Sequence, residues 1–274
     1  MCDRNEILDN VSRAATPVLA EGYRDLLKPF ATEAGNGLGH IGRFINTVLK
    51  GFDVASTKLD RKWNYYISKA NETVESIPPD RRVEPSLGVL QPIINGSWGA
   101  LDSEVIQDLF LSLLKTSMDR NTAAEAFPIH GELIKQLSPD EALIMVFLSK
   151  HNGYHPIINA VSANRDGSNI FSIIKDKISL LPRDINLKHP ENTPIYLDNL
   201  ERSGLIKTSF LQRVNPENLY KEVENTAEAL SAKSEIEKDP SQVCQFKPGI
   251  FYLSNLGKSF CRACISDSMR ESFL

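Results

Sequence analysis

Helical periodicity is the feature of this sequence that most restricts its fold. Five apolar residues recur at spacings of four and three, which places them on one face of an amphipathic helix: Trp63, Ile67, Ala70, Val74 and Ile77. Pro78 and Pro79 end that helix. A wider apolar stripe follows between residues 105 and 114. The first 150 residues therefore predict a run of helices.

Residues 138–141 form the clearest helix start in the chain. Ser138 can cap the helix, Pro139 suits the first helical position, and Glu141 can bond back to the cap as a capping box. We place a boundary here, with a helical module at residues 1–137 and a second module at residues 138–274.

The last third of the chain mixes helices and strands. Residues 195–202 predict a short helix that ends at Gly204, and residues 205–208 predict a strand. A helix towards Lys233, a polar loop, a strand at 250–253 and a helix capped by Ser254 follow. This order predicts a winged-helix-like α+β module whose wing carries a helical insertion. The fold class is then mainly α.

Charge argues against a protein held on nucleic acid by bulk electrostatics. The 274 residues contain 31 Lys and Arg against 35 Asp and Glu, a net charge of −4. We therefore expect no tight binding to nucleic acid.

The cysteines indicate free thiols in a reducing cytoplasm. The first ten residues hold four charged side chains and no apolar stretch of the kind that directs secretion. Cys244, Cys261 and Cys264 could suggest zinc, but a structural site takes four ligands. We expect no metal and no cofactor, with Cys261 and Cys264 buried in a core helix.

Catalytic motifs are missing from the sequence. It contains no HExxH, no GxSxG and no phosphate-binding GxxxxGK[ST] pattern. We therefore expect a non-catalytic protein rather than an enzyme.

A glycine-rich segment at residues 35–42 is the strongest candidate for an interaction site. The candidate residues are its four glycines and the two apolar residues that follow: Gly35, Gly37, Gly39, Gly42, Phe44 and Ile45. The spacing of Gly35 and Gly39 suits close backbone packing. Residues 35–50 could dock on a partner, or enter a bilayer when triggered. A loop followed by a helix packed on the core is the plainer alternative.

Several stretches together resemble the bacterial abortive-infection alpha family. They are YRDLLKP at 23–29, the glycines at 35–42, LQPII at 90–94, LFLSLLKTSMD at 109–119, LIKQLSPDEA at 133–142, YLDNLERSGLI at 196–206 and LSNLGKSF at 253–260. The resemblance implies a role in anti-phage defence and no known reaction. Phe127 stands where the family pattern leads us to expect a histidine, so a catalytic role for that histidine would not extend to this chain.

These observations support three functional hypotheses. The first is a non-catalytic defence protein that senses infection or arrests the infected cell through contacts with a phage or host protein, or with a second copy. The second is a membrane-acting effector that uses residues 35–50, cytoplasmic at rest and peripheral to the membrane when activated. The third is a DNA-binding regulator that uses the winged-helix-like module.

Overall fold

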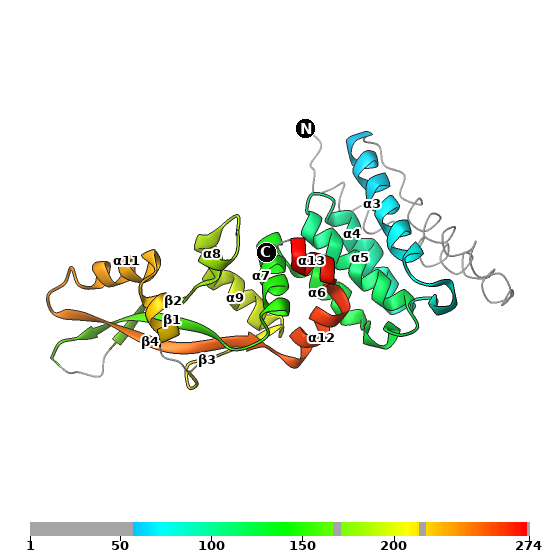
Figure 1. The fold of residues 1–274 in the computed structure, drawn as a ribbon. Coiled ribbons are helices and arrows are strands. Elements are labelled where there is room, and N and C mark those ends of the chain that lie inside the picture. Colours follow the sequence, from blue (N-terminus) through cyan, green and yellow to red (C-terminus); the bar gives the residue numbers. More distant parts are fainter. Residues whose placement is uncertain (1–56, 167–170, 214–217, 273–274) are drawn as a thin grey trace. The chain divides into compact units, whose positions relative to one another are not determined.

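The computed structural model describes residues 57–166, 171–213 and 218–272 (Figure 1). The chain divides into two compact units, Met1–Glu84 and Pro85–Leu274. This division lies at a different place from the boundary that we predict between residues 137 and 138.

The first unit contains the predicted amphipathic helix as α3 (Thr57–Glu75), followed by the 3-10 helix η1 (Pro79–Arg81). The predicted stripe from Trp63 to Ile77 is buried. Arg82 donates hydrogen bonds to the carbonyl oxygens of Ile77 at 2.8 Å and Glu75 at 2.9 Å. These bonds satisfy carbonyl groups at the end of the helix that have no partner within it.

The second unit begins with a run of helices, as the periodicity predicts: α4 (Leu87–Gly99), α5 (Glu104–Met118), η2 (Ala123–Glu125), α6 (Pro128–Gln136) and α7 (Pro139–Lys150). Two helices from the C-terminal end, α12 (Asn255–Cys264) and α13 (Asp267–Ser272), pack against α5 and α7. The predicted capping box is confirmed, because Ser138 Oγ accepts from Glu141 N at 3.3 Å and Ser138 N donates to Glu141 Oε2 at 2.7 Å.

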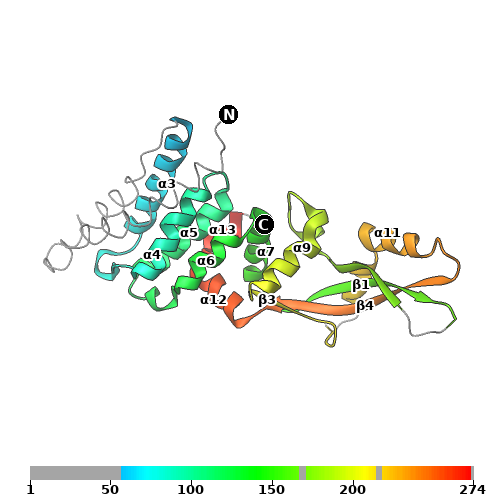
Figure 2. The ribbon, with the colours of Figure 1, turned by 180° about the vertical axis from the view of Figure 1, so that it is seen from behind.

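An antiparallel sheet forms the other part of this unit (Figures 1 and 2). Its strands are β1 (His155–Asn164), β2 (Phe171–Ser179), β3 (Ile206–Ser209) and β4 (Gln242–Leu253), in the order β2-β1-β4-β3. Five helical segments connect the strands: α8 (Leu181–Asp184), η3 (Pro190–Asn192), α9 (Thr193–Arg202), α10 (Asn218–Glu224) and α11 (Ala227–Ile236). Helices α10 and α11 bury an apolar cluster against β1 and β2.

The element order predicted for the last third is present as α9, β3, α10 with α11, β4 and α12. Gly204 ends α9 with a φ of 75°, in the left-handed region where glycine is favoured. However, all ten residues of β1 pair with β4, so the two predicted strands belong to a larger sheet. A winged-helix arrangement is therefore not confirmed, whereas a helix-rich chain with an α+β C-terminal part is.

Candidate functional site

Small residues allow α4 and α6 to run side by side in the same direction. A Cβ atom added at Gly88 would lie 3.2 Å from Pro128, and one added at Gly131 would lie 2.6 Å from Pro92. The contact positions advance together along both helices, so the helices are parallel. Glycine is required at residue 131 because a side chain there would overlap the proline.

The close packing of α4 against its neighbours extends to Gly96 and not to Gly99, one turn further along the helix. A Cβ atom at Gly96 would lie 2.2 Å from Phe110 Cζ and 2.8 Å from Lys135 Cγ, whereas one at Gly99 would meet no atom within 4 Å. A side chain at residue 99 would therefore have open space around it, whereas one at residue 96 would not.

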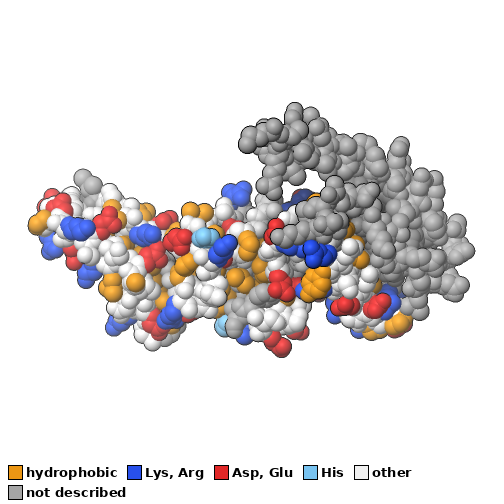
Figure 3. All heavy atoms as spheres, turned by 90° about the horizontal axis from the view of Figure 1, so that it is seen from above, with side chains coloured by type: hydrophobic (Ala, Val, Ile, Leu, Met, Phe, Trp, Pro, Cys, Tyr) orange, Lys and Arg blue, Asp and Glu red, His pale blue; other side chains and the backbone are white. Residues whose placement is uncertain are grey.

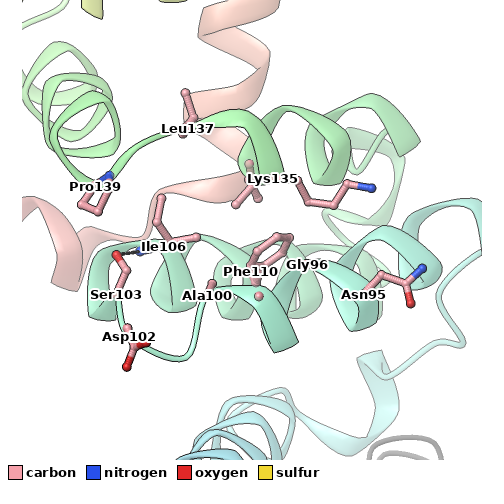
Figure 4. Close-up of a pocket in the computed structure, with 12 residues that line it drawn as sticks. Asn95, Gly96, Ala100, Asp102, Ser103, Ile106, Phe110, Lys135, Leu137 and Pro139 are labelled. Atoms are coloured by element: carbon pink, nitrogen blue, oxygen red, sulfur yellow. Dashed lines mark hydrogen bonds between the residues drawn. The ribbon is translucent and has the colours of Figure 1, made fainter. Parts of the chain in front are cut away.

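A pocket of about 420 Å³ opens at this point, between the last turns of α4 and α6 and the first turn of α5 (Figure 4). Ile106, Phe110 and Ile134 contribute buried apolar side chains to its lining. Asn95 and Lys135 are exposed at its edge. An apolar lining with a few polar groups at the edge is typical of a binding site.

Two of the polar side chains that line the pocket have partners within the chain. Lys135 Nζ lies 2.7 Å from Glu132 Oε2, and Ser103 Oγ accepts a hydrogen bond from Ile106 N as the cap of α5. These groups suit the recognition of an inserted side chain better than the activation of a nucleophile.

His130 forms the one His–Ser contact that we find among the described residues. Its Nδ1 accepts a hydrogen bond from Phe127 N at 3.4 Å, and its Nε2 lies 3.3 Å from Ser259 Oγ. The proton therefore belongs on Nε2, which donates to the serine and cannot act as its base. Burial, with repulsion from Arg262, lowers the pKa of His130 to about 4. His130 is a neutral helix cap in this arrangement.

The three cysteine thiols among the described residues are poorly reactive. Burial raises the pKa of Cys261 to about 12 and that of Cys264 well above its usual value, and Cys244 is raised for the same reason. A protonated thiol is a poor nucleophile and a poor metal ligand. The described ranges contain no group of three or more His, Cys, Asp or Glu side chains that could hold a metal ion.

Asp140 is a buried carboxylate with three hydrogen-bond partners. It accepts hydrogen bonds from Lys188 N and His189 N, both at 2.9 Å, and from the Tyr196 hydroxyl at 2.8 Å. Burial raises the pKa of Asp140, but these three bonds outweigh that effect and lower it overall. Asp140 therefore joins the start of α7 to α9 and the segment before it.

Lys177 is the centre of a second polar network. Its φ of 49° is left-handed, which is unusual for a residue with a side chain, and its N–H donates to Asn159 Oδ1 at 2.9 Å. Its ammonium contacts Asp198 and lies 3.0 Å from Glu201 Oε2. Glu201 also accepts from the backbone and hydroxyl of Thr208. This network joins β1, β2, α9 and β3.

The candidate interaction residues of the glycine-rich segment lie outside the described residues. They are Gly35, Gly37, Gly39, Gly42, Phe44 and Ile45. Their role in binding stays a prediction. Within the described part of the chain, no helix is both long enough and apolar enough to span a bilayer.

Comparisons with known proteins identify a family. A family model described as abortive infection alpha matches residues 58–264. No curated protein matches the chain. Among solved structures, an uncharacterized protein from the marine bacterium Alcanivorax borkumensis SK2 is 18% identical, with a TM-score of 0.35, and the match covers 50% of this chain and 93% of that one.

Proposed function

Because this chain belongs to the abortive infection alpha family, we propose that it is a bacterial defence protein that limits phage infection. The observation that carries this proposal is the family match, which extends over most of the chain. The sheet of the second unit and its helices from α4 to α12 lie within the matched residues.

The mechanism that we propose is contact with another protein. The chemically versatile groups of the described residues serve the fold: His130 caps α6, Asp140 joins α7 to α9, and burial keeps the thiols of Cys261 and Cys264 protonated. The pocket beside Gly99 offers an apolar recess that suits a side chain of a partner.

The DNA-binding alternative receives less support. In a winged helix the recognition helix enters the major groove, and α9 holds that place in the chain order. Asp198 and Glu201 put two carboxylates on α9, and both bind Lys177. Figure 3 shows acidic and basic side chains interspersed over the described residues of one face. This pattern differs from the basic surface that phosphate contacts require.

The membrane-acting alternative depends on residues 35–50, which lie outside the described residues. It stays a second proposal that a vesicle-leakage assay with the full chain can separate, because membrane action releases a dye from vesicles whereas protein contact does not.

The test of the proposed function is phage challenge of bacteria that express the full chain. We expect lower phage yield than in cells with an empty vector, and an equal yield would contradict the defence role. Gly99→Leu adds a large side chain at a residue that lines the pocket, at a position where a Cβ meets no atom within 4 Å, so the fold should tolerate it.

A matched control for that variant is Ser234→Leu, an exposed residue on α11 away from the pocket. Loss of protection with Gly99→Leu alone supports a role for the pocket in partner contact. Equal protection by both variants would remove the pocket from the mechanism while leaving the defence role intact.

A further inference from the structure

The sheet has an edge that is only partly paired. Strand β3 pairs with residues 250–253 of β4 and ends at Ser209. Strand β4 has twelve residues and begins at Gln242. Residues 242–249 therefore have β1 on one side and no described strand on the other.

The backbone groups that point to this open edge can be identified from the hydrogen bonds at both ends of β4. Ser254 N donates to Leu205 O at 3.0 Å, so residue 254 faces the β3 side. Arg165 N donates to Ser241 O at 2.9 Å, so residue 241 faces the β1 side. Both bonds give the same alternation along β4. The backbone N–H and C=O groups of even-numbered residues point away from β1, towards the β3 side of the strand.

Cys244 and Phe246 consequently direct their N–H groups to the open edge, where we find no partner for them among the described residues. Pro248 is the next outward residue and has no N–H to offer. Gln242 already donates its N–H to Asp239 O and accepts from Arg165 Nε at its carbonyl oxygen, both at 3.0 Å. The edge available for pairing is therefore residues 243–247, which we call the open edge. A row of unpaired backbone groups of this kind is a template for another strand.

The opposite edge of the sheet is protected in a way that the open edge is not. Strand β2 pairs with β1 through two register shifts, one between Ile158 and Ala160 and one between Ala160 and Val161. Bulges of this kind twist an edge and prevent further pairing. The pairing of β4 with β1 has no such shift.

The side chains beside the open edge define what a docked strand would need. Cys244 and Phe246 pack against the apolar cluster under α10 and α11, on one face of the sheet. Gln245 and Lys247 are exposed on the other face. A docked strand would therefore alternate apolar residues with polar ones, and an acidic residue would complement Lys247.

We propose that the open edge of β4 binds an extended segment of another protein as an additional antiparallel strand, with an acidic side chain near Lys247. This inference rests on the proposed function, since it names the kind of partner contact that function needs. A second copy fits less well, because β4 has no acidic residue to offer Lys247.

The test uses the full chain and a synthetic nine-residue peptide that alternates valine with threonine and glutamate. We expect amide hydrogen exchange of Cys244 and Phe246 to slow at least tenfold at saturating peptide. The amides of Val243 and Gln245, which face β1, should change little. No slowing at Cys244 and Phe246 in the folded protein would overturn the proposal.

Two modified peptides provide the matched control. Valines lie opposite Cys244 and Phe246 in this pairing and donate to β4, so N-methylation of the valines should abolish binding. N-methylation of the threonines and glutamates blocks groups that face away and should leave binding unchanged. Equal effects of both modifications would exclude pairing along the edge.

Lys247→Glu tests the charge without disturbing the backbone, since this side chain is exposed. We expect about threefold weaker binding of the glutamate peptide and tighter binding of a lysine version, because cross-strand charge pairs contribute on this scale. Peptide-sensitive dimerisation in sedimentation would assign the edge to a second copy and overturn the proposed partner. Phage protection without peptide binding would overturn this inference alone and leave the defence role standing.

Discussion

At the scale of single residues, Lys177 combines two opposing effects. Its left-handed backbone is costly for any residue with a Cβ atom, and its ammonium gains two carboxylate partners. The side chain therefore holds the backbone in a conformation that a glycine would adopt without strain.

Two substitutions separate these effects, because both remove the ammonium and only one removes the Cβ atom. We expect the free energy of unfolding to be about 0.5 to 1 kcal/mol higher for Lys177→Gly than for Lys177→Ala. Glycine relieves the backbone strain at this residue, and that gain exceeds the larger backbone entropy that glycine loses on folding. Urea denaturation of both proteins measures the difference. A less stable glycine variant would show that the backbone at residue 177 is not strained.

Asp140 predicts a dependence of stability on pH. Its pKa in the folded protein lies below its usual 3.8, so its contribution is complete above that value and is lost as pH falls through the lower, folded pKa. At pH 7, Asp140→Asn should cost about 2 to 3 kcal/mol, because the amide nitrogen would face backbone N–H donors. We expect the difference between the two proteins to shrink below pH 4.

Tyr196→Phe is the control for that experiment, since it removes one of the three hydrogen bonds and leaves the carboxylate in place. Its cost should be smaller than that of Asp140→Asn and should show a weaker dependence on pH. A difference between wild type and Asp140→Asn that stays constant from pH 7 to pH 3 would contradict the assigned role of the carboxylate.

At the scale of elements, the packing of α4 depends on which glycine is replaced. Gly96→Ala should destabilise the fold by about 2 to 3 kcal/mol, because the new methyl group would overlap Phe110. Gly99→Ala should stabilise it by up to about 1 kcal/mol, because alanine favours a helix and meets no neighbour there. Thermal unfolding of the two variants gives the comparison, and equal midpoints would argue against the close contact at Gly96.

The elements that the sequence predicted correctly are those whose signals are local. The apolar stripe of α3 and the capping box of α7 each depend on residues a few positions apart in the sequence, and both are confirmed. Strands β1 and β2 were not predicted, because β1 is buried at five consecutive positions and lacks the alternation of a half-buried strand. The larger sheet depends on pairing between strands that are far apart in the sequence, and the periodicity of apolar residues cannot predict which strands pair.

The pocket could not be predicted for a related reason. Its position follows from the overlap of Gly96 with Phe110 and from the open space beside Gly99. The sequence showed both glycines, but nothing in it distinguished the packed one from the open one. The predicted interaction segment at residues 35–50 belongs to a part of the chain that the structure does not describe.

At the scale of the whole molecule, the balance of basic and acidic side chains predicts weak binding to nucleic acid. Residues 151–274 contain 15 basic and 15 acidic side chains. We expect no tight binding to duplex DNA at physiological salt, because affinity of that kind requires several neutralised phosphates. Fluorescence anisotropy with a labelled duplex measures this, and nanomolar affinity with a steep salt dependence would favour the DNA-binding alternative.

The pairing of β1 with β4 also has a consequence for how each copy is made. The side chains of Asn164 and Gln242, which bond at 2.6 Å, are separated by 78 residues of chain. At about 5 to 20 residues per second, a ribosome needs roughly 4 to 16 s to deliver β4 after β1. During that interval the edge of β1 that pairs with β4 in the finished protein has no partner strand. Slow codons placed within residues 165–241 should therefore reduce the yield of folded protein without altering the stability of the finished molecule.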